Sequence, residues 1–241
     1  LFGTALHETI QAYLVCYYER TIKEADNLPL KDILQYRMEE NYKISKEQHG
    51  DDFEVTLEEM KEFFQDGNNI IDEFLKRKNS YFPKKNTEML GIEVGLNYNL
   101  PNNLNFVGYM DVVLHNKVTG RVKIIDIKTA TMGWNKYMKA DKNKTNQLLL
   151  YKQFFSKERE IPIDKIDIEY LILKRKLYEN IAYPQKRIQV FSPASGKPSI
   201  NRVITRLQEF MEECYDEDGN IIDNDYQKCE KHKKCRLCKD L

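Results

Sequence analysis

The first 80 residues have apolar side chains at helical spacing. Helices are expected over residues 4–25, 30–42 and 56–78. Thr56 and Glu59 have the spacing of a capping box, which marks the start of the third helix. Gly67 and the two asparagines after it could interrupt that helix in its middle. The front of the chain is therefore predicted to be a helical section.

The pattern changes near residue 87 to short runs rich in Ile, Val and aromatic residues, which are typical of strands. Strands are expected over residues 88–100, 105–116, 121–130, 165–176 and, at the sheet edge, 186–191; further helices are expected over 142–158 and 198–215. The segment between the second and third strands contains a Gly and has the length of a hairpin loop. This order of elements predicts an α/β fold, a mixed sheet flanked by helices.

The predicted elements form one domain over residues 1–241, with a helical section (1–80), a sheet core (87–192) and a C-terminal helix with a Cys-rich segment (198–241). The chain has 38 basic and 38 acidic side chains, so any basic surface must be local. There is no apolar run near 18 residues, which argues against a membrane span, and no secretory leader is visible. The chain begins without Met inside a predicted helix, and we expect further residues upstream.

An acid and a base lie inside the apolar run that contains Asp126 and Lys128, and burying an unpaired charge is costly. If the hairpin loop is centred between Val118 and Thr119, Asp111 lies directly opposite Asp126. Because side chains alternate along a strand, the two carboxylates and Lys128 then share one face. A divalent cation such as Mg²⁺ would neutralise both carboxylates. A plain Asp–Lys salt bridge is the alternative, and a slip of one residue would separate the groups.

Four further residues are candidates, and ordinary structural roles are the alternatives. Glu93 lies in a strand between Ile92 and Val94 and could be an outward-facing carboxylate. His7 is a lone histidine on an amphipathic helix, where packing or surface exposure is common. Gln147 and Tyr151 share a helix face, and Tyr151 alone would usually belong to the core.

Taken in order, four motifs resemble those of the RecB-type nucleases of the PD-(D/E)xK superfamily. They are Gly3-x-x-x-His7, Gly108-Tyr109-x-Asp111, Asp126-Ile127-Lys128 and Gln147-x-x-x-Tyr151. D-x-K alone is common in strands, whereas the ordered set, with a hairpin between the acids, is far more specific. The resemblance spans residues 3–151 and continues less distinctly to the C-terminus. It implies a restriction-endonuclease-like core.

The resemblance also implies roles for these residues. The implied ligands of a catalytic Mg²⁺ or Mn²⁺ are His7, Asp111, Asp126 and the Ile127 carbonyl. Lys128 would position or activate the attacking water and stabilise developing negative charge. Glu93 would be a supporting carboxylate, and Gln147 and Tyr151 would orient the DNA strand beside the site.

Two basic segments near these motifs are candidates for DNA contacts. Residues 128–144 interleave lysines such as Lys136 with Trp134 and a tyrosine, a composition that suits a single-stranded backbone and its bases. The second segment is residues 173–178, where Lys174 and Arg175 begin a short basic cluster. The ordinary alternatives are a solvated loop and a strand end.

Four potential metal ligands, three of them soft thiolates, crowd the C-terminus: Cys229, His232, Cys235 and Cys238. An odd total of five cysteines, three of them in this segment, indicates a reducing compartment rather than a disulfide framework. By resemblance to AddB-like and CRISPR-adaptation nucleases, three cysteines would hold a [4Fe–4S] cluster with a fourth upstream of the first motif; Cys16 is a poor substitute. Zinc held by all four residues is the alternative. Visible absorption, shown by the cluster alone, would separate them.

The sequence therefore predicts a divalent-metal-dependent DNA nuclease in the cytoplasm of a bacterium or an infected host. The resemblance favours an exonuclease on single-stranded or end-opened DNA in phage or bacterial recombination, repair or replication. A CRISPR-adaptation nuclease that trims DNA ends, and a non-catalytic nucleic-acid-binding or assembly module, are the alternatives. No phosphate-binding G-x-x-x-x-G-K-[ST] loop is present, so the chain is expected to be either a stand-alone nuclease or a subunit that works with a separate helicase or recombination protein.

Overall fold

The computed structural model describes residues 1–50 and 53–223. Its helices are α1 (Phe2–Glu19), α2 (Ile22–Asp26), α3 (Leu30–His49), α4 (Leu57–Tyr81), α5 (Lys136–Ala140), α6 (Lys142–Glu158) and α7 (Lys197–Cys214), with a 3₁₀ turn at Ile163–Lys165. Its strands are β1 (Thr87–Asn99), β2 (Asn105–Asn116), β3 (Arg121–Ala130), β4 (Ile166–Lys174) and β5 (Ile188–Phe191).

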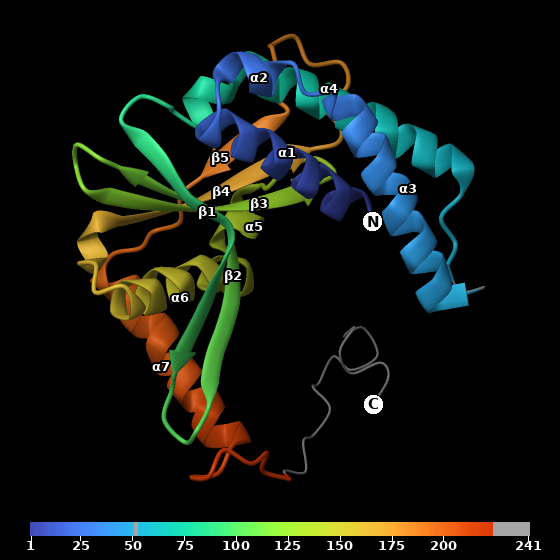
Figure 1. Ribbon diagram of the computed structural model, residues 1–241. Helices are drawn as coiled ribbons and strands as arrows, with labels where there is room; N and C mark the ends of the chain where they lie inside the picture. Colours follow the sequence, from blue (N-terminus) through green and yellow to red (C-terminus); the bar gives the residue numbers. More distant parts are fainter. Residues whose placement is uncertain (51–52, 224–241) are drawn as a thin grey trace.

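The five strands form one sheet in the order β1-β2-β3-β4-β5. Strands β3 and β4 run parallel, and the other neighbours are antiparallel. The α1–α4 section lies on one side of the sheet, and α6 and α7 lie on the other (Figure 1). A mixed sheet between helical layers, with a helical N-terminal section, confirms the predicted α/β fold class.

Each face of the sheet has its own hydrophobic core, because successive strand side chains point to opposite faces. Ile125 and Ile127 of β3 pack into the first core with α1, α3 and α4. Ile124 packs into the second core with α6 and α7. Alternation therefore places Asp126 on the α6 side of β3, at the end of an apolar run that is buried on both faces.

Two expected helices differ in continuity from those observed, and α3 ends later than the expected residue 42. The first expected helix is divided into α1 and α2, where Thr21 and Glu24 form a second capping box. Helix α4 begins with the predicted capping box but runs without interruption through Gly67. Gly67 is buried against α3, where a Cβ would lie 2.5 Å from a Leu34 methyl, so this glycine meets a packing requirement instead of breaking the helix.

Two predictions concern features beyond this core. Within the described part of the chain, no helix is long and apolar enough to cross a membrane. The proposed cluster or zinc ligands, Cys229, His232, Cys235 and Cys238, lie outside the described residues. Both forms of that metal site therefore stay predictions.

Candidate active site

Strands β1 and β2 are distorted together at Glu93 and Asp111. The register passes from Ile92 opposite Val112 directly to Val94 opposite Met110. Ile92 and Val112 contact the first core, whereas Val94 and Met110 contact the second, so side-chain alternation resets between them. Glu93 has a φ of 48°, in the left-handed region that residues other than glycine rarely adopt. Such strain costs about 1–3 kcal/mol and is concentrated at functional sites.

The hairpin of β2 and β3 has the register expected from the sequence. The pairing runs from Val112 opposite Ile125 to Asn116 opposite Arg121 next to the loop. The ladder ends one step before Asp111 and Asp126 would pair. There the Asp111 carboxylate accepts a hydrogen bond from the Ile127 backbone N–H, with Oδ2 2.6 Å from the nitrogen. A side-chain oxygen thus replaces a strand carbonyl, and this contact fixes Asp111 at the open end of the ladder.

Helix α1 carries His7 to these carboxylates. Its Nε2 atom lies 3.4 Å from Asp111 Oδ2 and 3.6 Å from Glu93 Oε1. One turn earlier, Gly3 lies so close to β3 that a Cβ would be 2.7 Å from Thr129 Oγ1. The Gly3-x-x-x-His7 spacing therefore has a physical explanation. The glycine permits close packing of α1 on the sheet, and the histidine follows on the same face.

Gln11 belongs to this cluster, although sequence reasoning did not select it. Its Nε2 donates to Glu93 Oε1 at 2.6 Å and lies 2.8 Å from His7 Nε2. The side chain is buried and holds the histidine and the glutamate together. Its position one turn after His7 was the available signal, because residues four apart share a helix face.

Among the described residues, the ligand atoms of His7, Glu93 and Asp111 all lie within 4.8 Å of one another. Burial lowers the pKa of His7, so the neutral ring can offer a nitrogen lone pair. Burial raises the pKa of Asp111, because a buried carboxylate is poorly solvated. The two carboxylate donors suit Mg²⁺ or Mn²⁺, and the imidazole nitrogen favours Mn²⁺ of these two ions. The structure thus joins Glu93 to His7 and Asp111, while Asp126 lies outside this group.

Asp126 faces Lys128, whose Nζ lies 3.1 Å from Oδ1 and 2.8 Å from Oδ2. The Asp126 side chain is only 2% exposed. Burial raises the pKa of Asp126, the charge of Asp111 raises it further, and Lys128 opposes both effects. Oδ2 accepts no well-aligned hydrogen bond from the described residues, despite its distance to Nζ. A buried carboxylate oxygen without full compensation is consistent with a cation site.

Helix α6 places Gln147 and Tyr151 beside β2. Gln147 Nε2 donates to the Tyr151 hydroxyl at 3.1 Å. Tyr151 is buried in the second core, where a Cβ on Gly108 would lie 2.5 Å from its ring. The described contacts of Tyr151 are therefore packing contacts, and its role in orienting DNA stays a prediction.

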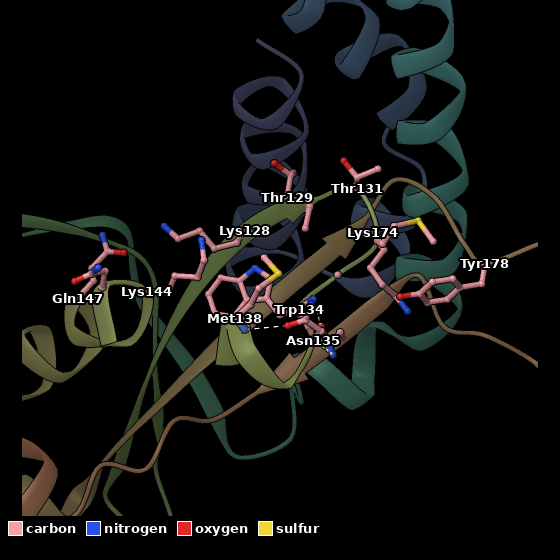
Figure 2. A pocket seen from close by; sticks show the side chains of 15 residues that line it. Lys128, Thr129, Thr131, Trp134, Asn135, Met138, Lys144, Gln147, Lys174 and Tyr178 are labelled. Atoms are coloured by element: carbon pink, nitrogen blue, oxygen red, sulfur yellow. Dashed lines mark hydrogen bonds between the residues drawn. The ribbon is translucent and has the colours of Figure 1, made fainter. Parts of the chain in front are cut away.

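A cavity of about 800 Å³ opens beside Lys128 (Figure 2). We call it the lysine pocket, because Lys128, Lys144 and Lys174 line it and none of its described lining residues is acidic. Trp134 and Gln147 also line it, and Lys144 Nζ lies 5.7 Å from the centre of the Trp134 ring. Four residues predicted from sequence to act in catalysis or DNA binding therefore meet here: Lys128, Trp134, Gln147 and Lys174.

Two other predicted DNA-binding residues lie elsewhere. Lys136 is exposed on α5. The Arg175 guanidinium contacts Asp66 at 3.1 Å and Glu62 at 3.4 Å and stacks 4.2 Å from the Phe63 ring centre. These contacts attach α4 to the end of β4, and the DNA-binding role of both residues stays a prediction.

Arg175→Ala tests whether this side chain is structural. We expect a loss of about 2–4 kcal/mol in unfolding free energy, because buried Asp66 would lose its closer partner. DNA affinity below the melting range should be unchanged. Chemical denaturation and fluorescence anisotropy measure the two quantities, with exposed Lys136→Ala as the comparison. Weaker DNA binding without a loss of stability would instead support the DNA-contact prediction.

Comparison with known proteins identified a family and solved structures that are similar to this chain. The family model for the PD-(D/E)XK nuclease superfamily matches residues 1–239. The crystal structure of a proposed exonuclease from Eubacterium rectale has a TM-score of 0.50 and 15% identity, over 98% of this chain and 74% of that chain. That similarity shows the fold. The structure of SSO0001 has a TM-score of 0.33 and 16% identity, over 73% of this chain and 69% of that chain, and carries no argument. No curated protein matched the sequence.

Proposed function

The chain belongs to the PD-(D/E)XK nuclease superfamily, and from this membership we propose that it is a divalent-metal-dependent deoxyribonuclease. We propose further that it is an exonuclease on single-stranded or end-opened DNA. The observation that supports metal-dependent cleavage is the convergence of His7, Glu93 and Asp111 next to the Asp126–Lys128 pair.

The side chains divide the chemistry between them. His7, Glu93 and Asp111 would hold Mg²⁺ or Mn²⁺. Asp126 is close enough to Asp111 for the two charges to interact, so its carboxylate would support the bound ion. The ion, when bound, would lower the pKa of a water molecule and offset charge on the phosphoryl oxygens. The Lys128 ammonium, anchored by Asp126, would orient the attacking water and stabilise negative charge as it develops.

The lysine pocket supports a nucleic-acid substrate at this site. Lys144 and Lys174 line this pocket together with Lys128, and neither of them forms an ion pair with the described residues. Cationic side chains without acidic neighbours suit a phosphate backbone. The DNA strand would therefore pass from the metal site into this pocket.

The alternatives have less support. An intact pair of aspartates with a lysine argues against a non-catalytic assembly module, and nothing in the site geometry favours trimming of DNA ends in CRISPR adaptation. We propose a role in phage or bacterial recombination, repair or replication, in the cytoplasm, with a separate helicase or recombination protein as partner. The cysteine composition supports a reducing compartment.

Digestion of end-labelled DNA tests the proposal directly. Linear single-stranded DNA should be degraded with Mg²⁺ or Mn²⁺ and should stay intact in EDTA, because the carboxylates cannot perform the reaction without the ion. Linear duplex DNA should be cut more slowly, and circular single strands should be spared. Degradation in EDTA would contradict metal dependence, and rapid cutting of circles would contradict the exonuclease assignment.

A further inference from the structure

The β1–β2 hairpin contains a long segment without charge. Residues 94–110 include no Asp, Glu, Lys or Arg, in a chain of which 32% of residues are charged. Five asparagines and two tyrosines take their place. Solvent-exposed hairpins usually carry charges that keep them soluble and unpaired. The absence of charges from this hairpin, next to the candidate active site, suggests that its surface binds another molecule.

One face of this hairpin is packed and the other is open. Leu96, Phe106 and Met110 pack on the α6 side, in the second core. The opposite face is exposed among the described residues, and in Figure 1 the hairpin extends past the helices that cover the rest of that side of the sheet. We call this face the hairpin platform; its residues are Gly95, Asn97, Asn99, Asn105, Val107 and Tyr109.

Tyr109 gives the platform a supported aromatic ring. The residue is 60% exposed and lies opposite Gly95 in the strand register. Its Cε1 atom is 3.8 Å from the position a Gly95 Cβ would take, so the ring reaches over the neighbouring strand. One side of the ring is therefore supported by backbone while the ring remains largely open to solvent. Aromatic rings held in this way are stacking surfaces for nucleobases.

The platform is continuous with the metal-ligand cluster. Tyr109 precedes Asp111 by two residues on β2, about 7 Å along a strand, and Gly95 follows Glu93 by the same interval on β1. The lysine pocket begins at Lys128 on β3. Cationic groups suit phosphates, whereas uncharged amide and aromatic groups suit bases.

We propose that the hairpin platform binds the unpaired bases of a single strand adjacent to the scissile phosphate, with a base stacked on Tyr109. This inference rests on the proposed nuclease function and specifies its substrate. Asparagine amides beside the ring can donate to and accept from base edges. A duplex keeps its bases stacked on one another, so the platform selects single-stranded DNA.

The experiment separates stacking from general binding. The protein is titrated with fluorescent single-stranded oligonucleotides in EDTA, which prevents cleavage, and cleavage is then measured with Mn²⁺. The oligonucleotides carry one abasic residue at each successive position. The variants are Tyr109→Ala and Tyr109→Phe, with Tyr36→Ala, a 58% exposed tyrosine on α3, as matched control.

Tyr109→Ala should weaken binding of the normal strand by about fivefold or more, the range found for loss of base stacking. Tyr109→Phe should retain affinity, and Tyr36→Ala should match the wild type. When the abasic residue occupies the position of the stacked base, the wild type should also bind more weakly than it binds the normal strand. At that position the abasic residue should cause no additional loss of affinity in Tyr109→Ala.

The platform proposal would be overturned if Tyr109→Ala lost affinity equally for the normal strand and for every abasic strand, or if it lost affinity for neither. Tyr109-dependent binding without cleavage at any metal concentration would retain the platform and refute the nuclease function. Metal-dependent cleavage that is unaffected by Tyr109→Ala would support the nuclease function and refute the platform.

Discussion

Lys128→Ala is expected to reduce the rate of DNA cleavage about a thousandfold, because the variant removes the ammonium group that we propose stabilises charge on the reacting phosphate. Loss of one preorganised electrostatic donor typically costs a factor of about 10²–10³, and loss of a proton-transfer group costs about 10²–10⁴. The change also leaves Asp126 buried without its cationic partner. The pKa of Asp126 would then rise further, which would weaken its support of the cation.

Lys123→Ala is the matched control for this experiment. Lys123 lies on the same strand, its side chain is 37% exposed like that of Lys128, and it also pairs with one acid, Glu169 at 3.4 Å. Single-turnover cleavage of labelled single-stranded DNA measures the rate, and thermal melting confirms folding. If Lys123→Ala and Lys128→Ala cut DNA at similar rates, Lys128 has no catalytic role.

Local pattern was sufficient to predict the part of this site that one hairpin builds. Loop length and strand alternation fix the β2–β3 register, and with it the proximity of Asp111 to the segment that carries Asp126 and Lys128. The capping box at Thr56 is also a local signal, and α4 begins there. These features depend on residues close together in the chain, so a single sequence contains their determinants.

Other parts of the site depend on contacts that local pattern does not reveal. Glu93 joins the cluster only because its backbone takes a positive φ where β1 and β2 are distorted together. Alternation alone would leave its direction undecided. Arg175 follows a basic strand end, yet α4 supplies its partners from more than a hundred positions earlier. Long-range packing decides between a structural and a DNA-binding role in such cases.

Asp111→Asn is expected to change stability in opposite directions with and without metal. Burial raises the pKa of Asp111 in the folded protein to about 6. The ionised carboxylate therefore destabilises the fold, and this effect is complete at a pH above the raised pKa. Asparagine removes the charge, and its amide oxygen can still accept from the Ile127 N–H. In EDTA at pH 8 the variant should therefore be more stable by about 1–3 kcal/mol, or several degrees in Tm. The advantage should shrink as the pH falls and Asp111 becomes protonated.

Mn²⁺ should reverse this order. A ligand that binds only the folded state stabilises it by about 2.7 kcal/mol at a hundred times its Kd, and the wild type offers two carboxylates to the ion where the variant offers one. The wild-type Tm should rise with Mn²⁺ and overtake that of Asp111→Asn, whose cleavage should be lost. Asp218→Asn, which changes an exposed carboxylate, should follow the wild type under both conditions. If Mn²⁺ raised the Tm of Asp111→Asn as much as that of the wild type, the ion would bind elsewhere, because its affinity would not depend on the carboxylate at the centre of the cluster.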